Sequence, residues 1–419
     1  MTNETAIPRL RFPEFNDIWE VKAFGDLYNF KTTNSFSRDN LNYDKGEVKN
    51  IHYGDIHTKF NSHFDITKEL VPFINEDVDI TRINDENYLV EGDLVIADAS
   101  EDYADIGKSI EIVHLNNEKT LAGLHTILAR RKSDDISIGF ASFVLKTNTI
   151  RTEVMKMAQG SKVLSISAGR LAKIRLTLPK PEEQDKIATF ITKVDRQIQL
   201  LEKEKKLLEK YKRAIIQKIF NQEIRFKDDD GNNFSDWEEK SLAEIGTIIT
   251  GKTPDTTKKE LWDGEVLFIT PTDIREGTKY QTATERSVKN TARIKVLPVN
   301  TIIYTCIASV GKMSISTKPS ITNQQINSII TFDQYNFELI YYSLLNITPK
   351  IKSTQSNTTL PIINKTEFSM FKIHIPTSKI EQNKIAYFLS NIDISIEKVA
   401  NQIFQSKKFK KGLLQKMFV

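Results

Sequence analysis

Short polar stretches carry the side chains that could do chemistry, and they recur in both halves of the chain. In the first half they are residues 31–38 (KTTNSFSR), 53–57 (YGDIH), 97–103 (ADASEDY), 107–108 (GK) and 160–162 (GSK). In the second half they are residues 250–254 (TGKTP), 270–274 (TPTDI), 305–312 (TCIASVGK), 322–325 (TNQQ) and 352–357 (KSTQSN). Amides, hydroxyls, Arg and Lys contact phosphates and base edges. Single stretches of this kind are ordinary surface turns, so their recurrence is what favours a binding role.

One stretch satisfies the phosphate-loop pattern G-x-x-x-x-G-K-[ST], residues 246–253 (GTIITGKT). A phosphate loop needs a strand, then a turn whose N–H groups surround the phosphate, then a helix. Here the residues between the glycines are β-branched and predict a strand, and Pro254 follows at once. We therefore predict no nucleotide site. An NTPase that uses Lys252 and Thr253 is kept as the alternative from the enzyme class.

Other catalytic signatures are absent from the sequence. It contains no [DNS]-P-P-[YF] motif and no F-x-G-x-G loop, and Pro254-Asp255 is not followed nearby by [DE]-x-K. The spacing of the six histidines matches no standard metal site. The single cysteine, Cys306, excludes a disulfide framework and is expected to be a small core residue. The sequence thus predicts no catalytic, cofactor-binding or metal-binding residue in this chain.

Composition is typical of a soluble globular protein. The chain has 419 residues, of which 39% are apolar and 27% charged, so two or three folded units are expected. No run approaches 18 uncharged apolar residues, and the N-terminus lacks the apolar segment of a signal peptide. We therefore expect a cytoplasmic protein without a membrane partner.

An internal repeat organises the chain. Placing Trp19 on Trp237 gives an offset of 218 residues, which also places residues 46–48 (GEV) on 264–266 (GEV). A second block, 182–198 (EEQDKIATFITKVDRQI), matches 380–396 (IEQNKIAYFLSNIDISI) at an offset of 198. The sequence predicts the order globular unit, helix, globular unit, helix. Within the two globular units it favours a helix near residues 138–158 and another near 336–347. The near-neutral units carry net charges of −4 (23 basic, 27 acidic) and zero (18 and 18), and the helical segments +3 (10 and 7) and +5 (8 and 3).

Both helical segments have heptad spacing of apolar residues, which predicts two long helices that pair in opposite directions as a coiled coil. In the first, positions a are residues 191, 198, 205, 212 and 219, and positions d are 194, 201, 208 and 215. In the second, a are 389, 396, 403, 410 and 417, and d are 392, 399, 406 and 413. Two amphipathic core helices are the plainer alternative. The candidate seam residues are Ile191, Val194, Ile198, Leu201, Leu208, Ile215, Leu389, Ile392, Ile396, Val399, Ile403 and Leu413.

The duplicated order of these pieces resembles the specificity (S) subunits of type I restriction–modification enzymes. The pieces are the opening Arg11–Trp19 with its counterpart Trp237-Glu238, the turn Gly251–Pro254, the stretch Thr322–Gln325, and EQ-x-KIA-x-F at the start of each helix. The first unit departs from the pattern, since it has Ala122–His125 (AGLH) where the second has TNQQ.

The resemblance implies a mixed α+β fold with two target recognition domains, residues 1–180 and 223–378. A central spacer helix (181–222) and a C-terminal helix (379–419) would form an antiparallel coiled coil. Each recognition domain would contact one half of a bipartite double-stranded DNA site. The helices would set the spacing and dock two modification (methyltransferase) subunits and two restriction (translocase and nuclease) subunits. S-adenosylmethionine, ATP and Mg²⁺ would be held by those partners, and this chain would be non-catalytic. A coiled-coil scaffold with no role on DNA is the alternative from the interaction class.

Candidate DNA contacts come from the repeated polar stretches. They are Lys31, Thr33, Asn34, Arg38, Tyr53, His57, Lys108, Lys162, Lys252, Thr253, Thr272, Lys312, Asn323, Gln324, Gln325, Lys352 and Gln355.

Overall fold

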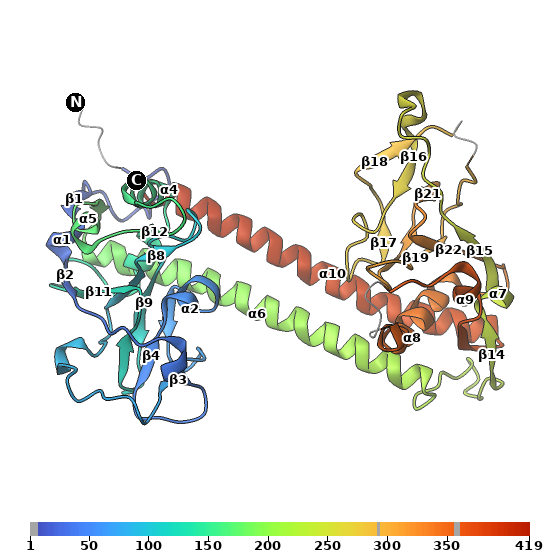
Figure 1. Cartoon of the computed structure of the whole chain (residues 1–419), viewed down its shortest axis with the longest axis horizontal. Coiled ribbons are helices and arrows are strands. Elements are labelled where there is room, and N and C mark those ends of the chain that lie inside the picture. Colours follow the sequence, from blue (N-terminus) through green and yellow to red (C-terminus); the bar gives the residue numbers. More distant parts are fainter. Residues whose placement is uncertain (1–6, 291–293, 356–360) are drawn as a thin grey trace. The chain divides into compact units, whose positions relative to one another are not determined.

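A computed structural model describes residues 7–290, 294–355 and 361–419. The chain forms two compact units: Met1–Leu200 with Ile403–Val419 (unit 1), and Leu201–Gln402 (unit 2). Figure 1 shows that each unit contains sheets and helices, with blue to green strands in unit 1 and yellow to orange strands in unit 2. The predicted mixed α+β class is confirmed.

The two predicted long helices are present as α6 (Pro181–Phe220) and α10 (Lys379–Lys416). Helix α6 begins at a proline, whose missing N–H costs nothing in the first turn. Glu182 and Glu183 in its first turn and Lys218 in its last complement the helix dipole. By sequence, α6 begins in unit 1 and ends in unit 2, while α10 does the reverse.

The main sheet of unit 1 has five strands in the order β2-β11-β7-β9-β5. Their bounds are β2 Tyr28–Lys31, β11 Thr126–Arg131, β7 Leu94–Ala97, β9 Ser109–His114 and β5 His63–Asp65. A four-stranded sheet has the order β10 (Thr120–Ala122), β4 (Lys49–Ile51), β6 (Phe73–Ile74), β3 (Leu41–Asn42). Two pairs complete the unit, β1 (Glu20–Ala23) with β13 (Arg175–Leu178), and β12 (Leu164–Ser165) with β8 (Ala99–Ser100). The short α-helices of unit 1 are α1 Phe24–Leu27, α2 Tyr53–Thr58, α3 Ala141–Val144, α4 Asn148–Met157 and α5 Ala168–Leu171, with 3-10 turns η1 Arg38–Asn40 and η2 Asp85–Asn87.

Unit 2 repeats this plan around the five-stranded sheet β15-β22-β19-β20-β17. Its strands are β15 Gly246–Thr250, β22 Ile326–Thr331, β19 Ile302–Thr305, β20 Met313–Ser316 and β17 Tyr280–Gln281. A three-stranded sheet, β18 (Arg286–Val288), β16 (Trp262–Ile269), β21 (Ser320–Thr322), and a pair, β14 (Trp237–Ser241) with β23 (Lys372–Pro376), accompany it. The helices are α7 Leu242–Ile245, α8 Phe337–Gln355 and α9 Lys365–Ser369, with the 3-10 turn η3 Lys259–Leu261.

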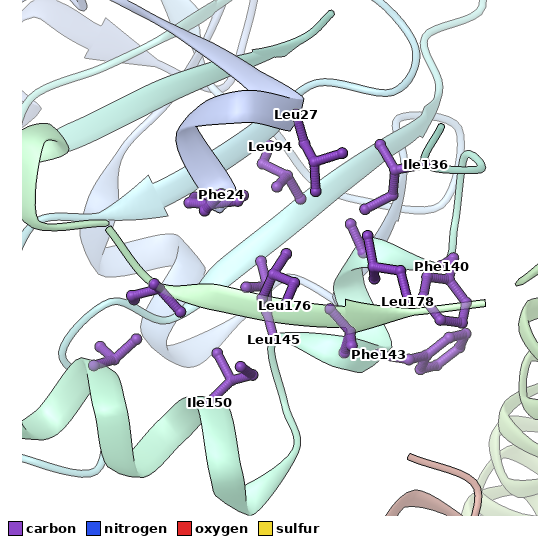
Figure 2. Close-up of a cluster of buried hydrophobic side chains, with 14 of the residues drawn as sticks. Phe24, Leu27, Leu94, Ile136, Phe140, Phe143, Leu145, Ile150, Leu176 and Leu178 are labelled. Carbon is purple, nitrogen blue, oxygen red and sulfur yellow. The ribbon is translucent and has the colours of Figure 1, made fainter. Parts of the chain in front are cut away.

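The central strands are buried on both faces because successive side chains point to opposite sides. Leu94 and Ile96 of β7 enter one apolar cluster, while Val95 and Ala97 enter another. Figure 2 shows the first cluster, in which Phe24, Leu94, Phe143 and Leu176 from four different elements lie together. This packing holds the sheet rigid, so the loops at its edges have a fixed platform.

Two sequence expectations for helices need correction. A helix near 138–158 was expected, but the chain forms α3 and α4 with a break between them. Thr147 adopts an extended backbone there, and its side chain accepts a hydrogen bond from the N–H of Ile150 to begin α4. The helix expected near 336–347 is longer, since α8 continues past Pro349 to Gln355.

Within each unit α6 and α10 run in opposite directions. In unit 1 Arg11 forms two hydrogen bonds with Glu183 near the start of α6, and the neighbouring N–H of Leu10 donates to the carbonyl of Lys416 at the end of α10. Further along α6, Asp195 pairs with Lys410 of α10 at 2.5 Å. In unit 2, Ile219 and Leu389 share one core cluster. All twelve candidate seam residues are buried or half-buried.

Candidate nucleic-acid interface

In unit 1 the polar loops converge at one edge of the main sheet. Strands β2, β11, β7 and β9 alternate in direction, so the ends of β2 and β7 meet the starts of β11 and β9. The Thr33 hydroxyl after β2 donates to the carbonyl of Thr126 at 2.9 Å, and the Asn34 amide donates to the carbonyl of Ala122 at 3.0 Å. These two side chains therefore tie the loop after β2 to the turn before β11. We call the loops at this edge the unit 1 loop cluster (residues 31–38, 52–59, 97–108 and 122–126).

Arg38 and α2 are joined by a buried carboxylate. Both oxygens of Asp55, which is fully buried, accept from the Arg38 guanidinium at 2.7 and 2.8 Å, and Lys59 adds a pair at 2.9 Å. Burial alone would raise the pKa of Asp55, but the hydrogen bonds from Arg38 and Lys59 lower it. Two cations share one buried anion, so the site keeps one excess positive charge. Arg38 is thus held in place rather than fully available to a ligand.

Imidazole and phenol rings gather beside this carboxylate. His52 accepts a hydrogen bond from the N–H of Gly54 and caps α2, and burial followed by the charge of Arg38 lowers the pKa of His52 to about 4. The ring of Tyr53 meets those of His57 and His125 edge to face, at 5.8 and 5.2 Å. The cluster presents flat rings and ring nitrogens, which are groups that stack on or hydrogen-bond to bases.

His125 and Asp98 belong to this cluster and were not among the sequence candidates. His125 has a φ of 54°, in the left-handed region, and its Nδ1 lies 3.4 Å from Asp98. A non-glycine residue in that region is uncommon and is held by its surroundings. The sequence did show that residues 122–125 (AGLH) differ from their counterparts 322–325 (TNQQ). It did not show that the imidazole of His125 stands where unit 2 has a side-chain amide.

The remaining unit 1 candidates are placed unevenly. Lys108 is in the loop cluster, since its ammonium donates to the carbonyl of His57 at 2.6 Å and pairs with Asp105 at 3.2 Å. Lys162 is exposed in the hairpin that ends in β12, which pairs with β8 beside the His57 ring. Lys31, at the start of the first loop of the cluster, is paired with Glu86 of η2. The loop cluster therefore includes Lys108 directly, while Lys162 lies next to it.

Unit 2 gathers its polar loops at the equivalent sheet edge. The Thr253 hydroxyl donates to the Gln324 side chain at 2.6 Å, and the Asn323 amide donates to that of Gln325 at 2.9 Å. A side chain at Gly251 would collide with the backbone of Thr322 and Asn323, so only glycine permits this approach of the two loops. We call the loops at this edge the unit 2 loop cluster (residues 250–254, 270–274, 305–312 and 322–325).

Thr272 and the basic candidates surround this edge. Thr272 is exposed and shares a hydrogen bond of 2.8 Å with the Thr270 hydroxyl, whose loop meets Asn323 through the Ile269 carbonyl. Lys252 and Lys352 are exposed, and Lys312 is half-buried. The side chain of Gln355 lies outside the described residues.

The phosphate-loop pattern is not a phosphate loop in the structure. Residues 246–250 form strand β15 in full register with β22, and no helix follows Lys252 and Thr253. The strand expected there is confirmed, and the geometry contradicts the NTPase alternative. Cys306 is buried, as expected, and its sulfur accepts from the amide of Asn327 at 3.2 Å.

Two absences concern the described residues. No group of three His, Cys, Asp or Glu side chains among them is arranged to hold a metal ion. None of the helices in that part of the chain has the length and apolar character that a bilayer crossing requires.

Comparison with known proteins gives one consistent result. The family model described as "Type I restriction modification DNA specificity domain" matches residues 16–210 and again 234–404. A type I restriction enzyme HindI specificity subunit from Haemophilus influenzae is 36% identical over 171 residues, which are 38% of this chain and 37% of that protein. The MjaIX specificity subunit from Methanocaldococcus jannaschii is 32% identical over 44% of this chain and 45% of its own length. These two matches thus span less than half of each relative.

A longer match and a solved structure cover nearly the whole chain. The putative MjaX specificity subunit from the same archaeon is 26% identical over 96% of this chain and 93% of its own. The crystal structure of a type I restriction–modification system S subunit from M. genitalium superposes with a TM-score of 0.61 at 14% identity, over 98% of this chain and 99% of that one. The latter likeness concerns the fold. The resemblance seen in the sequence is confirmed: the chain belongs to the type I restriction–modification DNA specificity family and contains its domain twice.

Proposed function

We propose that this chain is the DNA sequence-specificity subunit of a type I restriction–modification complex. Each unit would contact one half of a bipartite, asymmetric DNA site through its loop cluster. The chain itself would be non-catalytic, and it would act in the cytoplasm. Partner subunits would supply the chemistry, with S-adenosylmethionine for methylation of adenine N6, and ATP and Mg²⁺ for translocation and cleavage.

The observation that carries this proposal is the same sheet edge occurring twice with different side chains. In both units four alternating strands bring the loops together, and a short side-chain bond ties the first loop to the turn before the second strand. Unit 1 presents the imidazole of His125 where unit 2 presents the amides of Gln324 and Gln325. Two copies of one platform with different hydrogen-bonding groups are what two different half-sites require.

Affinity in this proposal comes from local cations and from two-site attachment. Neither recognition segment has a positive net charge, so overall charge cannot hold DNA. Lys252 and Lys352 are exposed at the unit 2 edge, and Lys162 beside the unit 1 loop cluster. Binding of one half-site raises the effective concentration of the other unit at its own half-site.

The long helices would set the distance between half-sites and dock the modification and restriction subunits. Their seam residues are buried or half-buried within the chain, so docking must use other positions. Large apolar side chains stay exposed on both helices, and a solved type I complex is among the structural neighbours at a TM-score of 0.54. These side chains are Leu200, Leu207 and Tyr211 of α6 and Ile380, Tyr387, Ile394, Phe404 and Phe409 of α10. Exposed apolar side chains on a helix are suited to contact a partner helix.

The test is to express the chain with a cognate modification subunit and S-adenosylmethionine, and to map methylated adenines across a genome by single-molecule sequencing. One two-part motif with a fixed gap is expected. A well-formed complex that neither methylates DNA nor binds it in a salt-dependent manner would contradict the proposal and favour the scaffold alternative.

A domain exchange tests the division between the units. Replacing residues 1–180 by the equivalent segment of a relative is expected to change one half of the motif and to leave the other half unchanged. The matched control replaces residues 223–378 and should change only the other half. Methylation altered in both halves by either exchange would contradict the modular assignment.

A further inference from the structure

Each unit contains one lysine–aspartate pair that joins α6 to α10. In unit 2 Lys212 of α6 pairs with Asp393 of α10, and in unit 1 Lys410 of α10 pairs with Asp195 of α6. The four side chains are 12–30% exposed. The repeat that sets residue 182 on residue 380 also sets Lys212 on Lys410 and Asp195 on Asp393. The two pairs are therefore copies of each other, with the helices exchanged.

Each pair also contacts the globular core of its own unit. The Lys212 ammonium lies 5.4 Å from the ring centroid of Tyr342 in α8, and the Lys410 ammonium lies 5.8 Å from that of Phe143 in α3. In unit 2 the Tyr342 hydroxyl donates a hydrogen bond to Asp393 at 2.5 Å. The pairs thus connect three elements in each unit: the two long helices and the helix that packs against the main sheet.

Stability alone does not account for a charged pair at a helix seam. Lys212 and Lys410 both occupy position a of the heptad. An apolar side chain there could be buried in the seam without the cost of removing water from a charged group. Replacing a shielded ion pair by apolar residues of similar size is often neutral or stabilising. A polar residue at a single a position has another effect, which is to fix the register of the helices.

The apolar seam by itself does not define one register. Its pattern repeats every seven residues, so sliding one helix along the other by one heptad keeps apolar residues facing each other. Such a slide places Lys212 opposite Ala386 or Ala400, separates both original pairs and offers at most one replacement ion pair. Only the observed register forms both pairs, because the spacing from Asp to Lys is the same on α6 as on α10.

We propose that the pairs Lys212–Asp393 and Lys410–Asp195 fix the register of α6 against α10, and through it the gap between the two DNA half-sites. The second part rests on the proposed function. A slide by one heptad moves one helix by about 10 Å, since each residue rises ~1.5 Å. That distance is about three base-pair steps of ~3.4 Å. These four residues are positioning residues, because they act on DNA only through the helices.

The register is measured first without DNA. Spin labels are attached to cysteines at two exposed positions of unit 2, Lys210→Cys in α6 and Ser395→Cys in α10, in a Cys306→Ser background. The parent should give one narrow distance distribution. The repelling variant, Lys212→Asp with Lys410→Asp, opposes like charges at both pairs and should add a second population at a longer distance, because a slide of about 10 Å along the helices carries the two facing labels apart. Adding Asp393→Lys and Asp195→Lys restores both pairs with reversed charges and should restore the single distance.

A matched control and a second variant keep the test decisive. Lys205→Asp with Lys398→Asp makes the same charge change, but Lys205 pairs within α6, with Glu209 at 2.6 Å, and Lys398 is exposed. This control should keep the single distance. Should the repelling variant not fold, the apolar variant Lys212→Met with Asp393→Leu, and the equivalent changes at residues 410 and 195, should fold and show the second population. A single unchanged distance in a folded repelling or apolar variant would overturn the proposal.

The second readout is the methylation motif of the assembled complex. The repelling variant is expected to methylate sites whose gap differs by about three base pairs, and the charge-reversed variant should return the parental gap. An identical gap at the parental level of methylation in the repelling variant would overturn the proposal. If the unchanged complex shows no two-part motif, the proposed function fails, while the distance measurement still decides the register.

Discussion

Each unit has an equivalent lysine–aspartate pair between the long helices, but the two units use different side chains near that pair to attach the main sheet to the helices. In unit 1 the His63 ring donates to the carbonyl of Gly139 at 2.5 Å and accepts from the Thr192 hydroxyl of α6 at 3.1 Å. Tyr280 of unit 2 corresponds to His63 of unit 1. Each is the first residue of the edge strand that pairs in parallel with the main sheet, β17 in unit 2 and β5 in unit 1.

Unit 2 adds a buried cation to this junction. The Lys279 ammonium, 5% exposed, donates to Glu338 at 2.5 Å and to the Ser390 hydroxyl of α10 at 2.7 Å. Glu338 of unit 2 corresponds in position to Gly139 of unit 1. Equivalent glutamines of the two long helices show this: Gln184 accepts from the N–H of Ser137, two residues before Gly139, and Gln382 accepts from the N–H of Asn336, two residues before Glu338. Both units thus keep a lysine–aspartate pair across the two helices, while the link to the sheet is a neutral ring in unit 1 and an ion network in unit 2.

The largest expected effect breaks the ion network of unit 2. Lys279→Met leaves the half-buried carboxylate of Glu338 without its main partner, and removing one member of a buried pair costs about 3–5 kcal/mol. The measurement is urea unfolding followed by tryptophan fluorescence in a Trp19→Phe background, which leaves Trp237 and Trp262 as reporters in unit 2.

Two controls belong to that measurement. The double variant Lys279→Met with Glu338→Gln should lose less than the sum of the single losses, because the uncompensated charge is gone. His63→Gln in unit 1, followed through Trp19 in a Trp237→Phe and Trp262→Phe background, should cost only about 1 kcal/mol, since neutral hydrogen bonds are at stake. Equal losses for Lys279→Met and His63→Gln would contradict the distinction between the two junctions.

The next effect is a pH dependence confined to unit 1. Glu111 of β9 is buried, and burial raises its pKa to about 7 although it accepts from the N–H groups of Gly139 and Ser142. The equivalent strand position in unit 2 is Ile315. A raised pKa in the folded state means that the protonated form is favoured there. The contribution of Glu111 to the free energy of unfolding is therefore fully present below about pH 4.5, which is the pKa of a glutamate in the unfolded chain. It is lost as the pH rises through about 7, the pKa of Glu111 in the folded state.

Unit 1 should therefore lose on the order of 1–3 kcal/mol of unfolding free energy between pH 4.5 and 7.5 because of this group. The measurement is urea unfolding at several pH values with Trp19 as the reporter, in a Trp237→Phe and Trp262→Phe background. Glu111→Gln should remove this loss, while the lowered pKa of His52, which acts in the opposite direction, is present with and without the substitution. A slope of equal size in the Glu111→Gln variant would assign the effect to other groups.

The elements of the fold were predictable where one local pattern decides them. The heptad spacing located α6 and α10, and the β-branched run 246–250 located β15. The ion network was not predictable, because Lys279, Glu338 and Ser390 are far apart in sequence and have no shared spacing. The sequence identified the polar loops as stretches, but it did not show what the individual side chains in them contact. Arg38 is held by a buried Asp55, and His125 joins the cluster only through the fold.

A specificity change in one half-site is the third expected effect. His125→Ala should relax recognition of the unit 1 half-site by roughly 1–3 kcal/mol, the worth of a good contact to one base, without altering the unit 2 half-site. Gln325→Ala, at the matching position of unit 2, should do the reverse. The methylation motif of each complex is the measurement. Relaxation of the same half by both variants would contradict the assignment of one loop cluster to each half-site.

The smallest effect sharpens the comparison of the two loop clusters by charge. Lys252 is exposed at the unit 2 edge, whereas Lys108 in unit 1 is tied to Asp105 and to the His57 carbonyl. A lysine that contacts a phosphate contributes about one unit to the slope of log affinity against log salt and does so for every sequence. Lys252→Ala in the assembled complex should therefore lower the salt slope by about 1 with the motif unchanged. Lys108→Ala should change the slope less, because the Lys108 ammonium is already engaged by Asp105 and the His57 carbonyl and is not free to neutralise a phosphate. A larger change in slope for Lys108→Ala than for Lys252→Ala would show that the free charge lies at the unit 1 edge instead.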